Sequence, residues 1–160
     1  MENKTIIQHQ SVPVASSFGD FTYNLEKILG LYTPGILNDL ETDPASVVGF
    51  LENLGGDHEL ILFNIIEHGE LLRLQGKKAK AKQYLLGNPM IAVKMTQHDL
   101  RAGLYAPLRI LVYEDQNKTT VVEYDLPSSQ FGQFGNDQIT AIAQALDRKL
   151  LNLISQADIE

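Results

Sequence analysis

The chain has 160 residues, 44% of them hydrophobic and 21% charged, a composition typical of a globular domain. It contains no cysteine, which excludes disulfides, thiolate nucleophiles and cysteine-ligated metals. A formal net charge of −7 disfavours nucleic acid and anionic membranes as partners. The first residues lack an export signal, and no run approaches the ~18 apolar residues of a membrane span. We therefore expect one cytoplasmic domain over residues 1–160, with no nucleic-acid or membrane partner.

The first predicted elements are a strand and a set of helices. Residues 5–15 alternate as in a strand, and Pro13, which has no N–H to donate, places that strand at a sheet edge. Residues 19–29 have apolar side chains at helical spacing, after two serines that can cap the helix. The pairs Thr33-Pro34 and Asp43-Pro44, each a capping side chain before a proline, predict the starts of two more short helices.

Two more strands are predicted in the middle of the chain. Residues 60–66 are almost continuously apolar, which predicts a strand covered on both faces. The next strand runs through alternating lysines to Leu86 and ends at the turn of residues 87–89. Alternating lysines usually protect a sheet edge from pairing with other molecules, so we expect this strand at an edge.

A β-hairpin and a long helix complete the chain. Residues 108–115 and 119–126 are β-rich runs around a short polar loop. If that loop has two residues, Arg109 lies opposite Tyr124. Residues 136–157 have the clearest helical stripe. Together these elements predict an α+β fold: a curved, mainly antiparallel sheet of about four or five strands, with the long C-terminal helix packed across one face.

The motif search excludes several site classes. There is no G-x-G-x-x-G and no Walker lysine. His58-Glu59 begins like the zinc motif H-E-x-x-H, but Leu62 stands where the second histidine is required. The four histidines never have ligand spacing within one element, so we expect no metal site, and the sequence names no cofactor.

One set of polar residues next to apolar strands remains as a candidate site. His68 is a candidate general acid or base, oriented by Glu67 or Glu114. Three further residues are candidates for ligand binding: Asn88, Arg109 and Tyr124. A structural interpretation of the same residues stays open, because Arg109 can stack on Tyr124 and Asn88 can simply hold its turn.

At these residues the chain resembles a known family, the domain of unknown function 302. Four blocks carry the resemblance: residues 63–68, 84–89, 104–115 and 122–127. The resemblance implies a compact α+β unit like one copy of the TATA-binding-protein fold, and a homodimer. The resemblance also implies that seven polar and turn residues recur in the family: Glu67, His68, Asn88, Pro89, Arg109, Glu114 and Tyr124. Residues 31–56 look like a helical insertion relative to the family pattern.

Three functions are consistent with the sequence. The favoured one is a binding module, in which a small molecule or a partner lies between the sheet and the long helix; for a small molecule it requires a cavity of about 300 Å³ or more. The first alternative is an enzyme in which His68 acts as acid or base and Arg109 holds an anionic group. The second is a homo-oligomeric scaffold that uses apolar surface around Phe50 and Leu54.

Overall fold

The computed structural model describes residues 4–159 and contains one six-stranded sheet. The strands are β1 (His9–Val14), β2 (Gly30–Leu31), β3 (Ile61–Ile66), β4 (Ala81–Gly87), β5 (Leu108–Glu114) and β6 (Thr120–Asp125), in the order β1-β6-β5-β4-β3-β2. All neighbours are antiparallel except β2 and β3. The predicted α+β class is confirmed. The sixth strand, β2, has two residues, too few to leave a sequence pattern.

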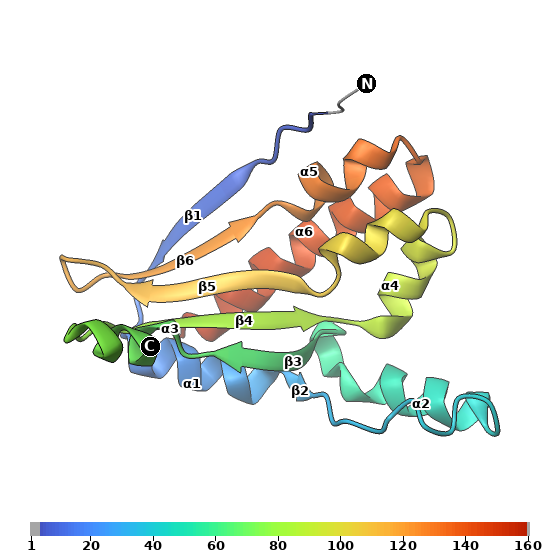
Figure 1. The fold of residues 1–160 in the computed structure, drawn as a ribbon, viewed down its shortest axis with the longest axis horizontal. Coiled ribbons are helices and arrows are strands. Elements are labelled where there is room, and N and C mark those ends of the chain that lie inside the picture. Colours follow the sequence, from blue (N-terminus) through green and yellow to red (C-terminus); the bar gives the residue numbers. More distant parts are fainter. Residues whose placement is uncertain (1–3, 160) are drawn as a thin grey trace.

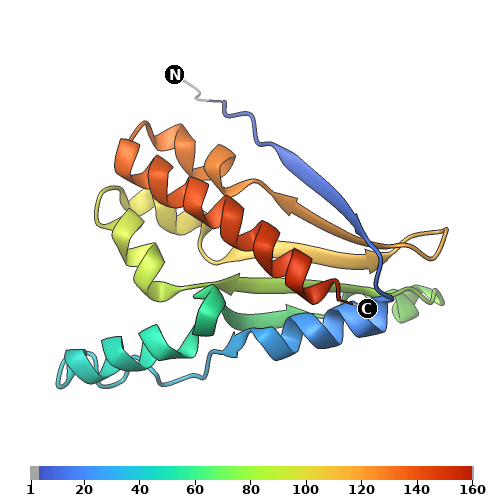
Figure 2. The same ribbon diagram turned by 180° about the vertical axis from the view of Figure 1, so that it is seen from behind.

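Helices cover one face of this sheet. They are α1 (Phe18–Ile28), α2 (Pro44–Leu54), α3 (His68–Leu71), α4 (Pro89–Thr96), α5 (Pro127–Phe131) and α6 (Asp137–Ala157). The long α6 and α1 lie across one face (Figure 2), and the opposite face, seen in Figure 1, carries no helix. In the part of the chain that the structure describes, no helix is both long enough and apolar enough to cross a membrane.

The core forms between α6 and the central strands. Leu146, Leu150 and Leu153 repeat on one side of α6 and are all buried, as their spacing predicts. They belong to the same core cluster as Tyr84 of β4 and Ile110 of β5, which have no exposed surface or almost none. Side chains therefore fill the space between sheet and long helix.

The position of β4 corrects the edge prediction. Pro13 does lie on an edge strand, β1. The lysine-bearing strand does not, because β4 lies between β3 and β5. The strand begins only at Ala81, so Lys78 and Lys80 precede it and edge protection was the wrong explanation for them.

The hairpin register differs from the predicted one by one residue. Ile110 lies opposite Tyr124, and the loop is one residue longer than the two-residue turn. Lys118, with φ 68°, takes the left-handed conformation in that loop. Because neighbouring side chains on a strand point to opposite faces, the slip separates Arg109 from Tyr124. Tyr124 is buried on the helix-covered face, whereas Arg109 is exposed on the open face.

Two expectations in the first half also need correction. No helix follows Thr33-Pro34, since residues 34–42 form turns; the helix after Asp43 is confirmed as α2. β3 is buried on both faces only at Ile61 and Leu62, and Asn64 is exposed. The reason is a register irregularity between Leu62 and Asn64, combined with the uncovered sheet face. That residues 31–56 are an insertion stays a prediction.

Candidate functional site

The structure places the predicted acid–base residues at one end of the sheet without joining them. His68 is exposed and begins α3, directly after β3 ends. Glu67 forms an ion pair of 3.3 Å with Lys82. Among the described residues, no hydrogen bond or ion pair links the His68 ring to a carboxylate. The orientation that general acid–base catalysis requires is therefore not supplied by this arrangement.

Glu114, at the end of β5, is held by lysines. Lys80 Nζ and Lys118 Nζ donate to its two carboxylate oxygens at 2.8 and 3.0 Å. These hydrogen bonds hold the pKa of Glu114 below its usual value, so it is a charged partner of the hairpin lysines. A carboxylate held in this way is a poor proton acceptor.

Asn88 lies at the other end of β4 and is almost fully buried. Its Oδ1 accepts from the N–H of Met90, which caps α4, and its Nδ2 donates to the carbonyl of Glu59 at 2.8 Å. The amide therefore fixes the start of α4 against the turn that precedes β3. This geometry fits the structural interpretation of Asn88.

Arg109 and Tyr124 do not converge with the other candidates. Among the described residues, the Arg109 side chain has no hydrogen-bond or ion-pair partner. Tyr124 lies under α6, where burial and the nearby Asp147 carboxylate raise its pKa. The six residues singled out in the sequence thus occupy both ends and both faces of the sheet.

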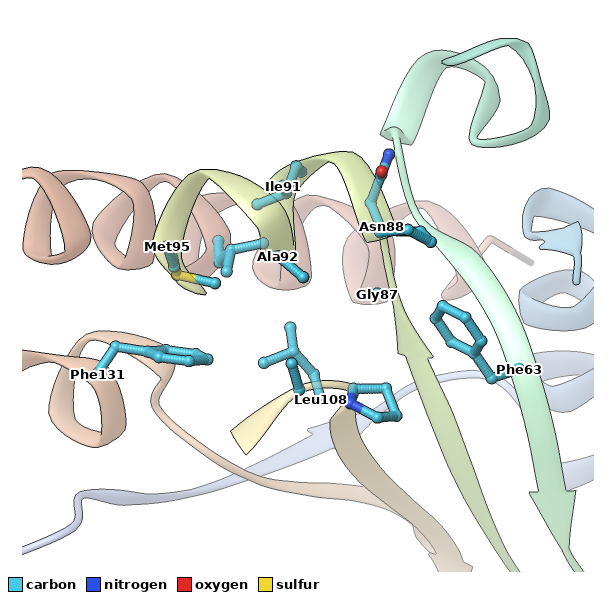
Figure 3. Close-up of a pocket in the computed structure, with 12 residues that line it drawn as sticks. Phe63, Gly87, Asn88, Ile91, Ala92, Met95, Leu108 and Phe131 are labelled. Atoms are coloured by element: carbon cyan, nitrogen blue, oxygen red, sulfur yellow. The ribbon is translucent and has the colours of Figure 1, made fainter. Parts of the chain in front are cut away.

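An apolar cavity lies at the Asn88 end of the sheet (Figure 3). It has a volume of about 220 Å³ and is partly open to solvent. Eleven of its twelve lining residues are apolar or glycine, and the other is Asn88, whose amide points away from the cavity. Its walls are formed by Phe63, Gly87, Asn88, Pro89, Ile91, Ala92, Met95, Ala106, Pro107, Leu108, Phe131 and Leu146.

Several elements meet to make this space. Ala92 and Met95 of α4 face Leu108 of β5 and Phe131 of α5 across it, and Phe63 closes one end (Figure 3). A Cβ on Gly87 would lie 3.7 Å from the Phe63 ring, so the missing side chain widens the cavity. The cavity is smaller than the 300 Å³ that the binding hypothesis required. It lies at one end of the space between the sheet and α6, where Leu108 of β5 and Leu146 of α6 line it, so a ligand between sheet and helix stays a prediction.

Sequence reasoning missed two polar clusters. On the open face, the His9 ring contacts Asp125 and Glu123 at 3.1 and 2.5 Å, and these contacts raise the pKa of His9. Beneath α1, Glu26 accepts from Lys82 at 3.0 Å and from the Tyr84 hydroxyl at 2.8 Å. Each cluster joins residues more than 50 positions apart, so only the strand order could reveal it.

Burial opposes the charge on Lys82, yet Glu26 and Glu67 hold its pKa above the usual value. Burial and the same carboxylates raise the pKa of Tyr84, so its hydroxyl stays protonated and donates. Within residues 4–159, no group of three or more histidine, aspartate or glutamate side chains is placed to hold a metal ion. These clusters are therefore hydrogen-bonded ion networks that tie elements together.

Comparison with known proteins identifies the family. The sequence pattern of the family described as "Domain of unknown function DUF302" matches residues 39–157, about three quarters of the chain. The chain belongs to the DUF302 family. The resemblance in the four sequence blocks is thereby confirmed.

A solved DUF302 structure has the same fold. The uncharacterized conserved protein DUF302 from Bacillus stearothermophilus has a TM-score of 0.66 with this chain at 16% sequence identity. The match covers 93% of this chain and 97% of that one. No curated protein matches the chain. Family and fold are thus fixed, and the function must be argued from the residues of this DUF302 protein.

Proposed function

We propose that this DUF302 protein binds a small apolar molecule in the cavity between α4, α5 and the start of β5. The observation that carries the proposal is the cavity itself, about 220 Å³, partly open and apolar in almost all of its lining. Tightly packed interiors contain few voids larger than a water molecule. The residues that line this cavity lack van der Waals contacts on the cavity side, and a bound apolar group would supply them.

Size and polarity define the ligand class. An apolar cavity of roughly 150 Å³ is enough to bind benzene, so this one accommodates a single ring or a short hydrocarbon chain. The lining offers no charged side chain, and both polar groups of Asn88 already have partners. The buried part of the ligand is therefore uncharged and binds mainly by the hydrophobic effect.

The surroundings hold the cavity in shape. Asn88 anchors the first turn of α4, and two further residues of this helix, Ala92 and Met95, face the cavity. On the opposite wall, the Phe131 ring packs edge-on against Tyr105 at 6.0 Å between ring centroids. A preformed site of this kind loses little conformational entropy on binding.

An NMR titration with indole tests the proposal. Backbone amide shifts should saturate and should be largest for Ile91, Ala92 and Leu108. Ala92→Phe places a ring in the cavity and should abolish the saturable shifts. Val93→Phe, at an exposed position on the same helix, should leave them intact. The proposal fails if indole gives no saturable shifts, or if Ala92→Phe binds as well as Val93→Phe.

A further inference from the structure

One segment of the surface combines exposed leucines with basic residues. Residues 71–80, here named the basic tip, run from the end of α3 through a short 3₁₀ helix to the start of β4, and every one of them is exposed. Three of the ten are leucines, and Leu74 is 82% exposed. Leu71 and Leu74 are three residues apart in helical backbone, so they lie on the same side. Clustered exposed apolar side chains are typical of sites that contact a protein or a membrane.

The charge of the basic tip is of one sign. It contains four of the 13 basic residues and no carboxylate. Arg73 pairs with Glu70, and Lys80 pairs with Glu114. Among the residues that the structure describes, Lys77 and Lys78 form no ion pair, so both charges are available to a partner.

The hairpin loop between β5 and β6 lies beside the basic tip. Both project past the strands at the same end of the sheet (Figures 1 and 2). Between them is a shallow hollow lined by Lys78, Lys80 and Lys118, together with Glu114 and Asp115. Glu114 already accepts from two of these lysines, and the Asp115 carboxylate accepts two backbone N–H groups of its own loop. An anionic group in the hollow would therefore meet three ammonium groups and two carboxylates that have partners.

The acidic part of the chain lies far from the basic tip. Residues 28–60 contain six carboxylates and no lysine or arginine, and they include α2, which lies toward the other end of the longest axis (Figure 1). β3 separates the two regions, and its six residues span about 20 Å. That is about twice the Debye length at 0.1 M salt. The net charge of −7, which argued against an anionic membrane as partner, averages these regions and does not describe the basic tip.

We propose that the basic tip binds the surface of an anionic lipid bilayer, with Leu71 and Leu74 inserted among the headgroups and Lys77 and Lys78 beside the lipid phosphates. Charge complementarity selects this occupant, because an anionic bilayer offers negative headgroups directly above an apolar layer. A fluid bilayer also adapts to a projecting segment, whereas a folded protein would need a matching groove. In this orientation the acidic end points away from the membrane, where salt screens its repulsion.

Cosedimentation of the full chain with phosphatidylglycerol vesicles tests the charge contribution. Binding should weaken with salt and should be much weaker to phosphatidylcholine vesicles. Lys77→Gln/Lys78→Gln should lower the vesicle affinity about thirtyfold. The matched control is Lys27→Gln/Lys94→Gln, which changes the net charge equally at exposed positions on α1 and α4 and should leave the affinity nearly unchanged.

Tryptophan fluorescence tests insertion of the leucines. The chain contains no tryptophan, so a single introduced one reports on its own surroundings. The emission of Leu74→Trp should shift to shorter wavelength on phosphatidylglycerol vesicles and should be quenched by brominated acyl chains. Leu100→Trp, at an equally exposed leucine beside α4, should show neither change.

Three results would overturn the proposal: no binding of the original chain to phosphatidylglycerol vesicles at low salt, equal weakening by the two lysine pairs, or an unchanged Leu74→Trp emission on vesicles. An emission that shifts with polyglutamate and not with vesicles would assign the basic tip to an acidic protein instead. Circular dichroism melts establish that each variant is folded, and indole binding serves as a separate readout of the cavity.

Discussion

The Tyr84 hydroxyl should contribute measurably to the free energy of unfolding. Tyr84 has no exposed surface, and its hydroxyl donates to Glu26 at 2.8 Å. Hydrogen bonds to charged groups contribute about 1.5–3 kcal/mol. Because the Glu26 side chain is 34% exposed, we take the lower end. Tyr84→Phe should therefore destabilise the protein by about 1.5 kcal/mol, which lowers the melting temperature by roughly 3–6 °C.

A matched control is available on the open face. The Tyr113 hydroxyl also donates to a glutamate, Glu123, but at 3.2 Å and on a half-exposed residue. Tyr113→Phe should change stability by no more than about 0.5 kcal/mol. Urea unfolding of both variants measures the difference, and adding Glu26→Gln should remove most of the Tyr84 effect. If the two tyrosine variants are equally stable, the network beneath α1 does not hold α1 to the sheet.

Three further predictions concern single positions. The contacts with Asp125 and Glu123 raise the pKa of His9, so the stability that His9 contributes is complete below pH 6.5, its ordinary pKa, and is lost as pH rises through the higher pKa of the folded state. The melting-temperature difference between the original chain and His9→Gln should therefore shrink from pH 6 to pH 8.5, and a constant difference would contradict the pairing. Asn88→Ala should lower the free energy of unfolding by about 1–2 kcal/mol, measured with urea. Asn88→Asp keeps the acceptor but not the donor, so its stability should lie between those of the original chain and Asn88→Ala, and equal losses in the two variants would contradict the two-sided role of the amide. A Cβ on Gly69 would lie 2.4 Å from the carbonyl oxygen of Ala79, so Gly69→Ala should destabilise the protein by about 2 kcal/mol. Gly49 lies on α2 with open space around it, so Gly49→Ala should stabilise the protein by roughly 0.7 kcal/mol. Calorimetric melts that show the same sign for both variants would refute this packing.

Local chemistry made most of the fold predictable. The cap at Asn136 and the apolar stripe identified α6, and Pro13 placed β1 at an edge. The hairpin register depended on one loop residue, since Lys118 and not Asn117 has positive φ. β4 looked like an edge strand because alternating lysines mark that position in many sheets. Here Lys82, within β4, pairs with Glu26 of α1, and Lys80, just before the strand, pairs with Glu114 of β5.

The candidate site was less predictable because it depends on contacts between distant residues. Conspicuous polar side chains in the sequence turned out to serve caps and ion pairs, as Asn88 and Glu114 do. The cavity is lined by ordinary apolar residues such as Ala92, Leu108 and Phe131. Nothing in their sequence context distinguishes them from core residues, and only the way the elements meet leaves space between them.

Analysis of the molecules that copurify with the protein tests the central claim most directly. The untagged chain and the Ala92→Phe and Val93→Phe variants are purified gently in parallel, denatured and extracted with organic solvent, and the extracts are quantified by mass spectrometry. We predict one small apolar compound, near one equivalent per chain, in the original and in Val93→Phe and absent from Ala92→Phe. Identical extracts from all three proteins would contradict binding in the cavity.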